Sequence, residues 1–177
     1  MLYGNHDYIK SYGTCCREFT YYGGLILEDC LTKKCIYLTH GHQADVWNST
    51  LWKLSRFLVR YVWKPLELFG IPDPTSAAKN YQLREKTEFR LLQWADKNNR
   101  ILVCGHTHRA TAGSSSYFNS GCCIYPGNIT ALELSGRQLT LVKWTLGTRE
   151  DRSLYVAREL LSEPIAVFAQ TDTDTPS

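Results

Sequence analysis

Three short segments of the chain combine histidine with glycine, and together they contain all five of its histidines. They are Gly4-Asn5-His6-Asp7, His40-Gly41-His42 and Gly105-His106-Thr107-His108. Histidines used only for packing or for the surface would be scattered along the chain, so this clustering indicates a site. Neutral imidazole is a common ligand of zinc and other divalent metals, and it also serves as an acid or base near neutral pH.

The paired histidines favour a metal site. In His106-Thr107-His108 the two imidazoles fall on the same side if the segment is extended, because side chains alternate along an extended chain. One such pair is a weak signal, since surface histidines fall two residues apart by chance. A second glycine-flanked pair, His40 and His42, strengthens it. We therefore expect a divalent metal of the zinc, iron or manganese kind.

The segments that precede the two histidine pairs are predicted to be strands. Cys35 to Leu38 and Ile101 to Cys104 are apolar runs that end just before a histidine pair, as is typical of strands buried on both faces. Open α/β sheets place their sites at the carboxyl ends of such strands. Nearer the C-terminus, Ile129 to Leu134 and Leu139 to Trp144 flank Ser135-Gly136-Arg137-Gln138, which predicts a hairpin.

Between the two histidine pairs the pattern changes to helix. We expect a first, aromatic-rich helix over Val46 to Phe69, with Asp45 as its N-cap and Pro65 ending or kinking it. A second helix is expected from about Ala77 to Lys97. The following pair, Asn98-Asn99, suits a left-handed C-terminal cap.

In this order the three histidine segments resemble the last three motifs of the calcineurin-like metallophosphoesterases, over the chain from its start to about Trp144. The resemblance implies an α/β fold in which a sandwich of two β-sheets is flanked by helices. It implies a hydrolase of phosphomonoesters or phosphodiesters with two divalent metal ions (manganese, iron or zinc). Such a metal pair clamps the phosphoryl oxygens and acidifies a bridging water.

The resemblance also implies a role for each motif residue. Asn5, His40 and His106 would bind one metal, and His108 would bind the other. His6 would donate a hydrogen bond or a proton near the leaving-group oxygen, and Asp7 would orient its ring; a general acid of this kind contributes typically ~10²–10⁴-fold to the rate.

The family's first two motifs, Asp-x-His and Gly-Asp-x-x-Asp, have no counterpart in this chain. His108 would then be the only remaining ligand of its metal. Two explanations stay open, a fragment of a longer enzyme and a short protein that has lost catalysis and acts as a binding scaffold. Because the chain starts at the last residues of a strand, we expect the fragment.

The segment between the motifs offers a substrate-binding hypothesis. Lys53, Arg56, Arg60 and Lys64 recur at steps of three and four, so on a helix they form one basic stripe. The stripe is either a solvated face or part of a lid over the site. In a lid, Arg56 and Arg60 would bind an anionic head group of the substrate. A lid here resembles that of bacterial UDP-diacylglucosamine hydrolases, which cleave a lipid-linked pyrophosphate. In that family arginine usually replaces the histidine that is His6 here. His42 either contacts a metal or the substrate or caps a turn, and we expect it beside the metal ligands rather than as one of them.

Composition narrows the class of protein. A net charge of +3 over 177 residues gives no reason to expect nucleic acid. No uninterrupted apolar run reaches the ~18 residues of a spanning helix. The seven cysteines form no CxxC pair, so we expect reduced thiols in a cytoplasmic protein. The expected partner is a phosphorylated small molecule, a nucleotide or a lipid-linked substrate. Peripheral membrane contact and the oligomeric state stay open.

We expect one phosphoesterase-type domain over residues 1–163, with a helical insertion at about 45–99. A flexible polar tail is expected over residues 164–177.

Overall fold

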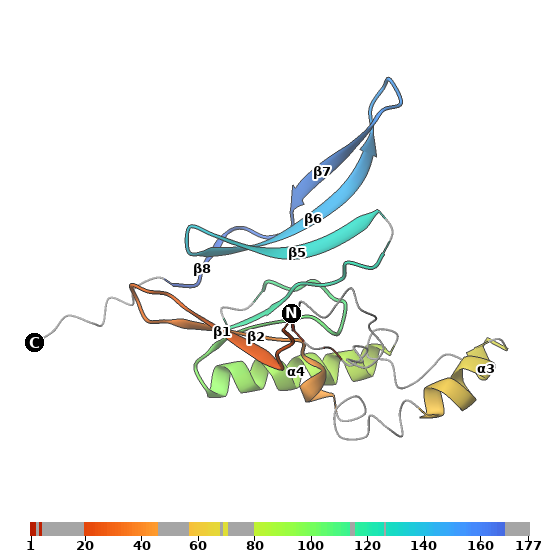
Figure 1. Ribbon diagram of the computed structural model, residues 1–177, viewed down its shortest axis with the longest axis horizontal. Coiled ribbons are helices and arrows are strands. Elements are labelled where there is room, and N and C mark those ends of the chain that lie inside the picture. The colour runs from red at the N-terminus through yellow and green to blue at the C-terminus, as the bar shows by residue number, and fades with distance from the viewer. Residues whose placement is uncertain are drawn as a thin grey trace, which may run out of the picture.

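The fold consists of two four-stranded β-sheets stacked face to face, with one long helix on the outside of the first (Figure 1). The computed structural model describes residues 1–2, 4, 20–45, 57–67, 69–70, 80–113, 116–125 and 127–168. The expected mixed α/β class is therefore confirmed. In the described part of the chain, no helix is long and apolar enough to cross a lipid bilayer.

The first sheet has the strand order β1-β2-β3-β4 and contains both strands that precede a histidine pair. Its strands are β1 (Gly24–Glu28), β2 (Cys35–Thr39), β3 (Ile101–Cys104) and β4 (Tyr117–Asn119). β1 pairs antiparallel with β2, whereas β2, β3 and β4 run parallel. The strand predictions for β2 and β3 are confirmed.

Helix α4 (Tyr81–Lys97) makes the crossover between β2 and β3. It begins four residues later than the expected Ala77, because extended Asn80 accepts a hydrogen bond from Leu83 N at 3.2 Å and caps the helix. At the other end, Asn99 has φ 49° and Arg100 N bonds to Ala95 O at 2.9 Å. This is the left-handed cap that the sequence predicted.

The second sheet is an antiparallel array around one long strand. β6 (Gln138–Thr148) pairs with β5 (Asn128–Ser135), β7 (Leu154–Leu160) and β8 (Ile165–Ala166). Gly136 and Arg137 form the β5–β6 turn with φ 54° and 65°. Two left-handed residues match the twist of a hairpin, so the hairpin prediction is confirmed.

Two apolar cores separate the three layers. Ile36, Phe118, Leu139, Val167 and Phe168 fill the space between the sheets. On the other face of the first sheet, Leu91 and Ala95 of α4 pack against a second group: Leu102, Cys104 and Tyr117. β2 and β3 therefore have packing on both faces, as their apolar sequences predicted.

Part of the outer face of the second sheet is exposed in the described part of the chain. Several of its apolar side chains are exposed: Ile129, Leu146, Leu154, Val156 and Leu160. A fourth, helical layer over that face is thus not part of the described structure. The β6–β7 hairpin extends well beyond the body of the fold (Figure 1).

The described part of the predicted insertion is helical but irregular. A π-helical stretch, η3 (Val59–Trp63), is followed by α3 (Lys64–Glu67), and Pro65 lies at the start of α3. Proline is tolerated in a first helical turn, where its missing N–H is not needed. Residues 46–56 lie outside the described residues. α4 lies within the segment expected as the insertion, and it packs on the first sheet.

The ordered fold reaches past residue 164, where we expected the tail to begin. Ile165 and Ala166 form β8, and Val167 and Phe168 are buried between the sheets at 5% and 6% exposure. Residues 169–177 lie outside the described part of the chain.

Gly121, between β4 and β5, provides a test of this packing. Its φ is +78°, and a Cβ there would overlap Thr130 Oγ1 and lie 2.8 Å from Ala110 Cβ. We expect Gly121→Ala to lower the free energy of unfolding by about 2–4 kcal/mol, from the left-handed backbone and overpacking together. Chemical denaturation measures the loss. The control is Gly23→Ala, because nothing lies within 4 Å of a Cβ at Gly23. It should change the free energy of unfolding by less than about 1 kcal/mol. Equal effects would contradict this account.

Candidate functional site

The ends of the parallel strands β2 and β3 bring two histidine segments together. Leu38 is paired with Val103, and beyond the strands Gly105 N donates to His40 O at 3.1 Å. His40 and His106 have their ring centroids 5.2 Å apart. Side chains 66 positions apart in sequence thus meet because neighbouring parallel strands end at the same edge of a sheet.

His42 completes a group of three imidazoles, which we call the histidine cluster (His40, His42 and His106). His40 Nδ1 lies 3.2 Å from His42 Nδ1, and the rings of His42 and His106 are 6.3 Å apart. Gly41, with φ 102°, lies between the first two. A Cβ on Gly41 would lie 3.3 Å from Cys104 Cβ and 3.5 Å from His106 Cβ. Glycine suits this position because a side chain would be strained at this positive φ and would crowd Cys104.

Asp45 is a member of the site that the sequence interpretation missed. Its side chain is fully buried, and its Oδ2 lies 3.3 Å from Nε2 of His106, which is only 5% exposed. We expected Asp45 to cap a helix, but the residues that follow lie outside the described part of the chain. The available signal was a carboxylate three residues after His42, in the loop that leaves a histidine-bearing strand.

The expectation that His106 and His108 share one side of an extended segment is wrong. Both residues have left-handed backbones, with φ 64° and 58°. His106 lies against Asp45 and His40, whereas His108 Nδ1 lies 3.6 Å from Cys122 Sγ and its ring is 6.4 Å from that of Tyr125. Alternation holds only for extended backbone, so it does not apply here.

Buried polar groups hold the loop that contains these two histidines. Asn119, with no exposed surface, donates from Nδ2 to Gly105 O at 2.8 Å and to Thr107 Oγ1 at 3.0 Å. Its Oδ1 accepts from Gly121 N at 2.9 Å. Such a satisfied network fixes a unique loop geometry, since breaking it leaves buried groups unpaired.

The neighbouring thiol and phenol are structural groups. Burial raises the pKa of the Cys104 thiol to about 12, and burial together with Cys104 raises the pKa of Tyr117 as well. Both stay protonated near neutral pH, and Cys104 Sγ donates to Tyr117 OH at 3.6 Å. Neither group is therefore a nucleophile at neutral pH. The described cysteines (Cys30, Cys35, Cys104, Cys122 and Cys123) are free, as expected.

The imidazole nitrogens of the histidine cluster and the neighbouring carboxylate of Asp45 are of the chemical types that bind divalent metals. Imidazole and carboxylate are ligands of zinc, iron and manganese. Within the described residues, however, no three side chains of the histidine, cysteine, aspartate or glutamate type surround one metal position. His106 Nε2 faces Asp45 instead.

Arg60, another predicted site residue, lies apart from this group. Arg60 is exposed on η3, where its guanidinium lies 5.7 Å from the ring centroid of Tyr61. In Figure 1 α3, which follows η3 directly, extends away from α4 and the sheets. Four predicted residues fall outside the described part of the chain: Asn5, His6, Asp7 and Arg56.

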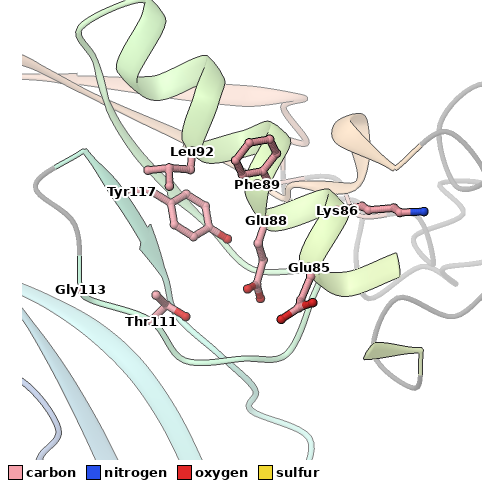
Figure 2. A pocket seen from close by; sticks show the side chains of 8 residues that line it. All are labelled: Glu85, Lys86, Glu88, Phe89, Leu92, Thr111, Gly113 and Tyr117. Atoms are coloured by element: carbon pink, nitrogen blue, oxygen red, sulfur yellow. The ribbon is translucent and has the colours of Figure 1, made fainter. Parts of the chain in front are cut away.

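A pocket of about 590 Å³ lies between α4 and the segment that follows His108 (Figure 2). Phe89, Leu92 and Tyr117 form its apolar side, and the carboxylates of Glu85 and Glu88 enter it from α4. A second groove, of about 530 Å³, runs along β1, β2 and α4. Neither pocket is lined by a member of the histidine cluster.

No match was found when the chain was compared with models of protein families, with characterised proteins and with solved structures.

The contact between Asp45 and His106 can be tested by substitution. Asp45→Ala leaves the buried His106 without this partner, so we expect the free energy of unfolding to fall by about 1–3 kcal/mol. Asp45→Asn keeps an acceptor oxygen, so it should lower the free energy of unfolding by less than Asp45→Ala does. Denaturant titration of both variants measures the difference, with Asp151→Ala on the exposed β6–β7 turn as control. A loss for Asp45→Ala no larger than that of the control would show that the contact contributes no stability.

Proposed function

We propose that this chain is part of a metal-dependent phosphoester hydrolase, a phosphomonoesterase or phosphodiesterase with a dinuclear metal centre. The observation that carries the proposal is the meeting of His40, His42 and His106 at the ends of two parallel strands, where the rings of the proposed ligands His40 and His106 have centroids 5.2 Å apart. The two segments that meet are also those that resemble the metallophosphoesterase motifs. A third segment with the matching sequence, Gly4-Asn5-His6-Asp7, precedes them in the expected order.

Two divalent ions, when bound, would polarise the phosphoryl oxygens and lower the pKa of a water that attacks phosphorus. In this proposal Asn5, His40 and His106 hold one ion and His108 holds the other. Asp45 accepts a hydrogen bond from His106 Nε2, which leaves Nδ1 of that ring for the ion. A carboxylate behind a ligand histidine fixes its tautomer and orientation.

The remaining residues act on the substrate. His6, oriented by Asp7, donates a proton to the leaving-group oxygen as the bond to phosphorus breaks. His42 lies beside His40 and binds the substrate's phosphoryl group or the water around it. These roles follow from position in the motifs and from the chemistry of imidazole near neutral pH.

Exposed aromatic side chains favour a lipid-linked pyrophosphate as the alternative substrate class. Phe57, Tyr61 and Phe69 are 57%, 60% and 82% exposed on the segment that also carries Arg60. Aromatic surface beside a cation suits a ligand with an anionic head and an apolar tail. A binding scaffold without catalysis is the third candidate, and it predicts no metal-dependent turnover.

The catalytic proposal is tested on the protein expressed from its complete gene. We expect hydrolysis of an aryl phosphate or a phosphodiester with added manganese, and its loss when a chelator is added. His40→Ala should lower metal content and turnover together, because His40 is a proposed ligand. His6→Gln should lower turnover ~10²-fold or more, as expected for loss of a general acid, with metal content retained.

Elemental analysis and steady-state kinetics measure these two quantities. Arg149→Ala, at the tip of the β6–β7 hairpin, is the control and should match the wild type. Turnover that is insensitive to the chelator, or unchanged in His40→Ala, would refute the proposed function. Equal loss of metal and turnover in His6→Gln would make His6 a ligand.

The substrate class is tested with a double variant of the basic stripe. If Arg56 and Arg60 bind an anionic head group, Arg56→Ala with Arg60→Ala should raise the KM for a bulky lipid-linked or nucleotide substrate about tenfold or more, since each charge-assisted contact contributes about 1.5–3 kcal/mol. The KM for a small aryl phosphate should stay unchanged. Unchanged KM values for both substrates would identify the stripe as a solvated face.

A further inference from the structure

Helix α4 contacts both loops that carry the histidine cluster. Glu88 Oε1 accepts from Thr107 Oγ1 at 2.8 Å, and its Oε2 lies 3.2 Å from Arg109 Nη1. Two residues further along the helix, Arg90 Nη1 donates to Ala44 O at 3.1 Å. Figure 2 shows the Glu88 carboxylate extending from α4 toward the chain near Thr111.

These contacts form a closed ring. Glu88 is hydrogen-bonded to Thr107, which is the neighbour of His106 in the chain. His106 contacts Asp45, and Asp45 follows Ala44 in the chain. The carbonyl of Ala44 accepts a hydrogen bond from Arg90. The backbone of α4 joins Arg90 to Glu88 and closes the ring. Both histidine-bearing loops are therefore tied to one rigid element.

The helix is well suited to act as that fixed element. Its buried side chains Thr87, Leu91 and Ala95 recur every four residues and pack it on the first sheet. Thr87 Oγ1 also donates to Leu83 O at 2.9 Å within the helix. Glu88 is 12% exposed in its side chain, and it lies beside this buried stripe rather than within it.

The loop over residues 105–109 needs such a support. His106 and His108 have left-handed backbones, each of which costs about 1–2 kcal/mol for a residue with a Cβ. A strained backbone of this kind persists only where the surroundings determine it. Glu88 binds the residues on both sides of His108, and Thr107 is also the neighbour of His106.

We propose that Glu88 and Arg90 are positioning residues, through which α4 sets the separation of the two loops and holds His106 against His40. The inference concerns the same cluster as the proposed function and deepens it by naming what orders the site. It rests on contacts within the chain, so its test does not require catalysis.

The test compares Glu88→Met and Arg90→Met with the matched control Glu85→Met. Methionine keeps the length and helix propensity of these side chains but lacks the acceptor or donor. Glu85 lies one turn before Glu88, on the same pocket, outside the ring of contacts. The readout is the nuclear Overhauser contact between the His40 and His106 rings, whose centroids are 5.2 Å apart.

We expect this ring contact to be lost in Glu88→Met and in Arg90→Met, and to be retained in Glu85→Met. The conservative variants Glu88→Gln and Arg90→Lys restore an acceptor for Thr107 and a donor for Ala44, so they should retain it. Far-ultraviolet circular dichroism should show the wild-type fold in every variant.

Retention of the ring contact in both methionine variants would overturn the inference. Its loss in Glu85→Met as well, or loss of the fold in Glu88→Met or Arg90→Met, would also overturn it, because the two residues would then be general supports of structure.

With the metal-dependent assay, kcat of Glu88→Met should fall about tenfold or more at a KM within about twofold of the wild type, as expected when reacting groups are misplaced. No activity in the wild type would count against the proposed function, and the ring contact would still decide this inference.

Discussion

The parallel pairing of β2 with β3 is the constraint on which the rest of the structure depends. It aligns the ends of two strands that are more than 60 residues apart in the chain, and the bond from Gly105 N to His40 O extends that alignment into the loops. A parallel pair needs a crossover, and α4 supplies it. The same helix then buries the outer face of the pair, so that a single connection creates the sheet, its second core and the support of the site.

Buried polar side chains in this region have specific partners. Asn119 and Asp45 have no exposed surface. Asn119 is hydrogen-bonded to the loop over residues 105–109, and Asp45 contacts His106 in that loop. An unpaired buried polar group costs more than a hydrogen bond gains, so such groups select one loop geometry over its alternatives. The site is thus specified by polar contacts, whereas the layers around it are held by apolar packing.

Two glycines permit the close approaches that this arrangement requires. Gly41 lets the His40–His42 loop lie close to Cys104, and Gly121 lets the chain leave β4 between Ala110 and Thr130. Both have positive φ, which glycine adopts without the penalty that a Cβ imposes. His106 and His108 adopt such angles with a Cβ, and they do so where neighbouring residues are hydrogen-bonded.

Local pattern determined the strands β2 and β3, the β5–β6 hairpin and the Asn99 cap of α4, because each depends on a few adjacent residues with strong conformational preferences. It also placed four histidines just beyond two strands. Only the tertiary structure decided where the imidazoles point, since the left-handed backbones of His106 and His108 separate rings that an extended chain would align. It alone revealed Asp45, Glu88 and Arg90 as neighbours of the site. Their contacts join residues 19 to 61 positions apart, and no short-range pattern records which distant partner a charged side chain will meet.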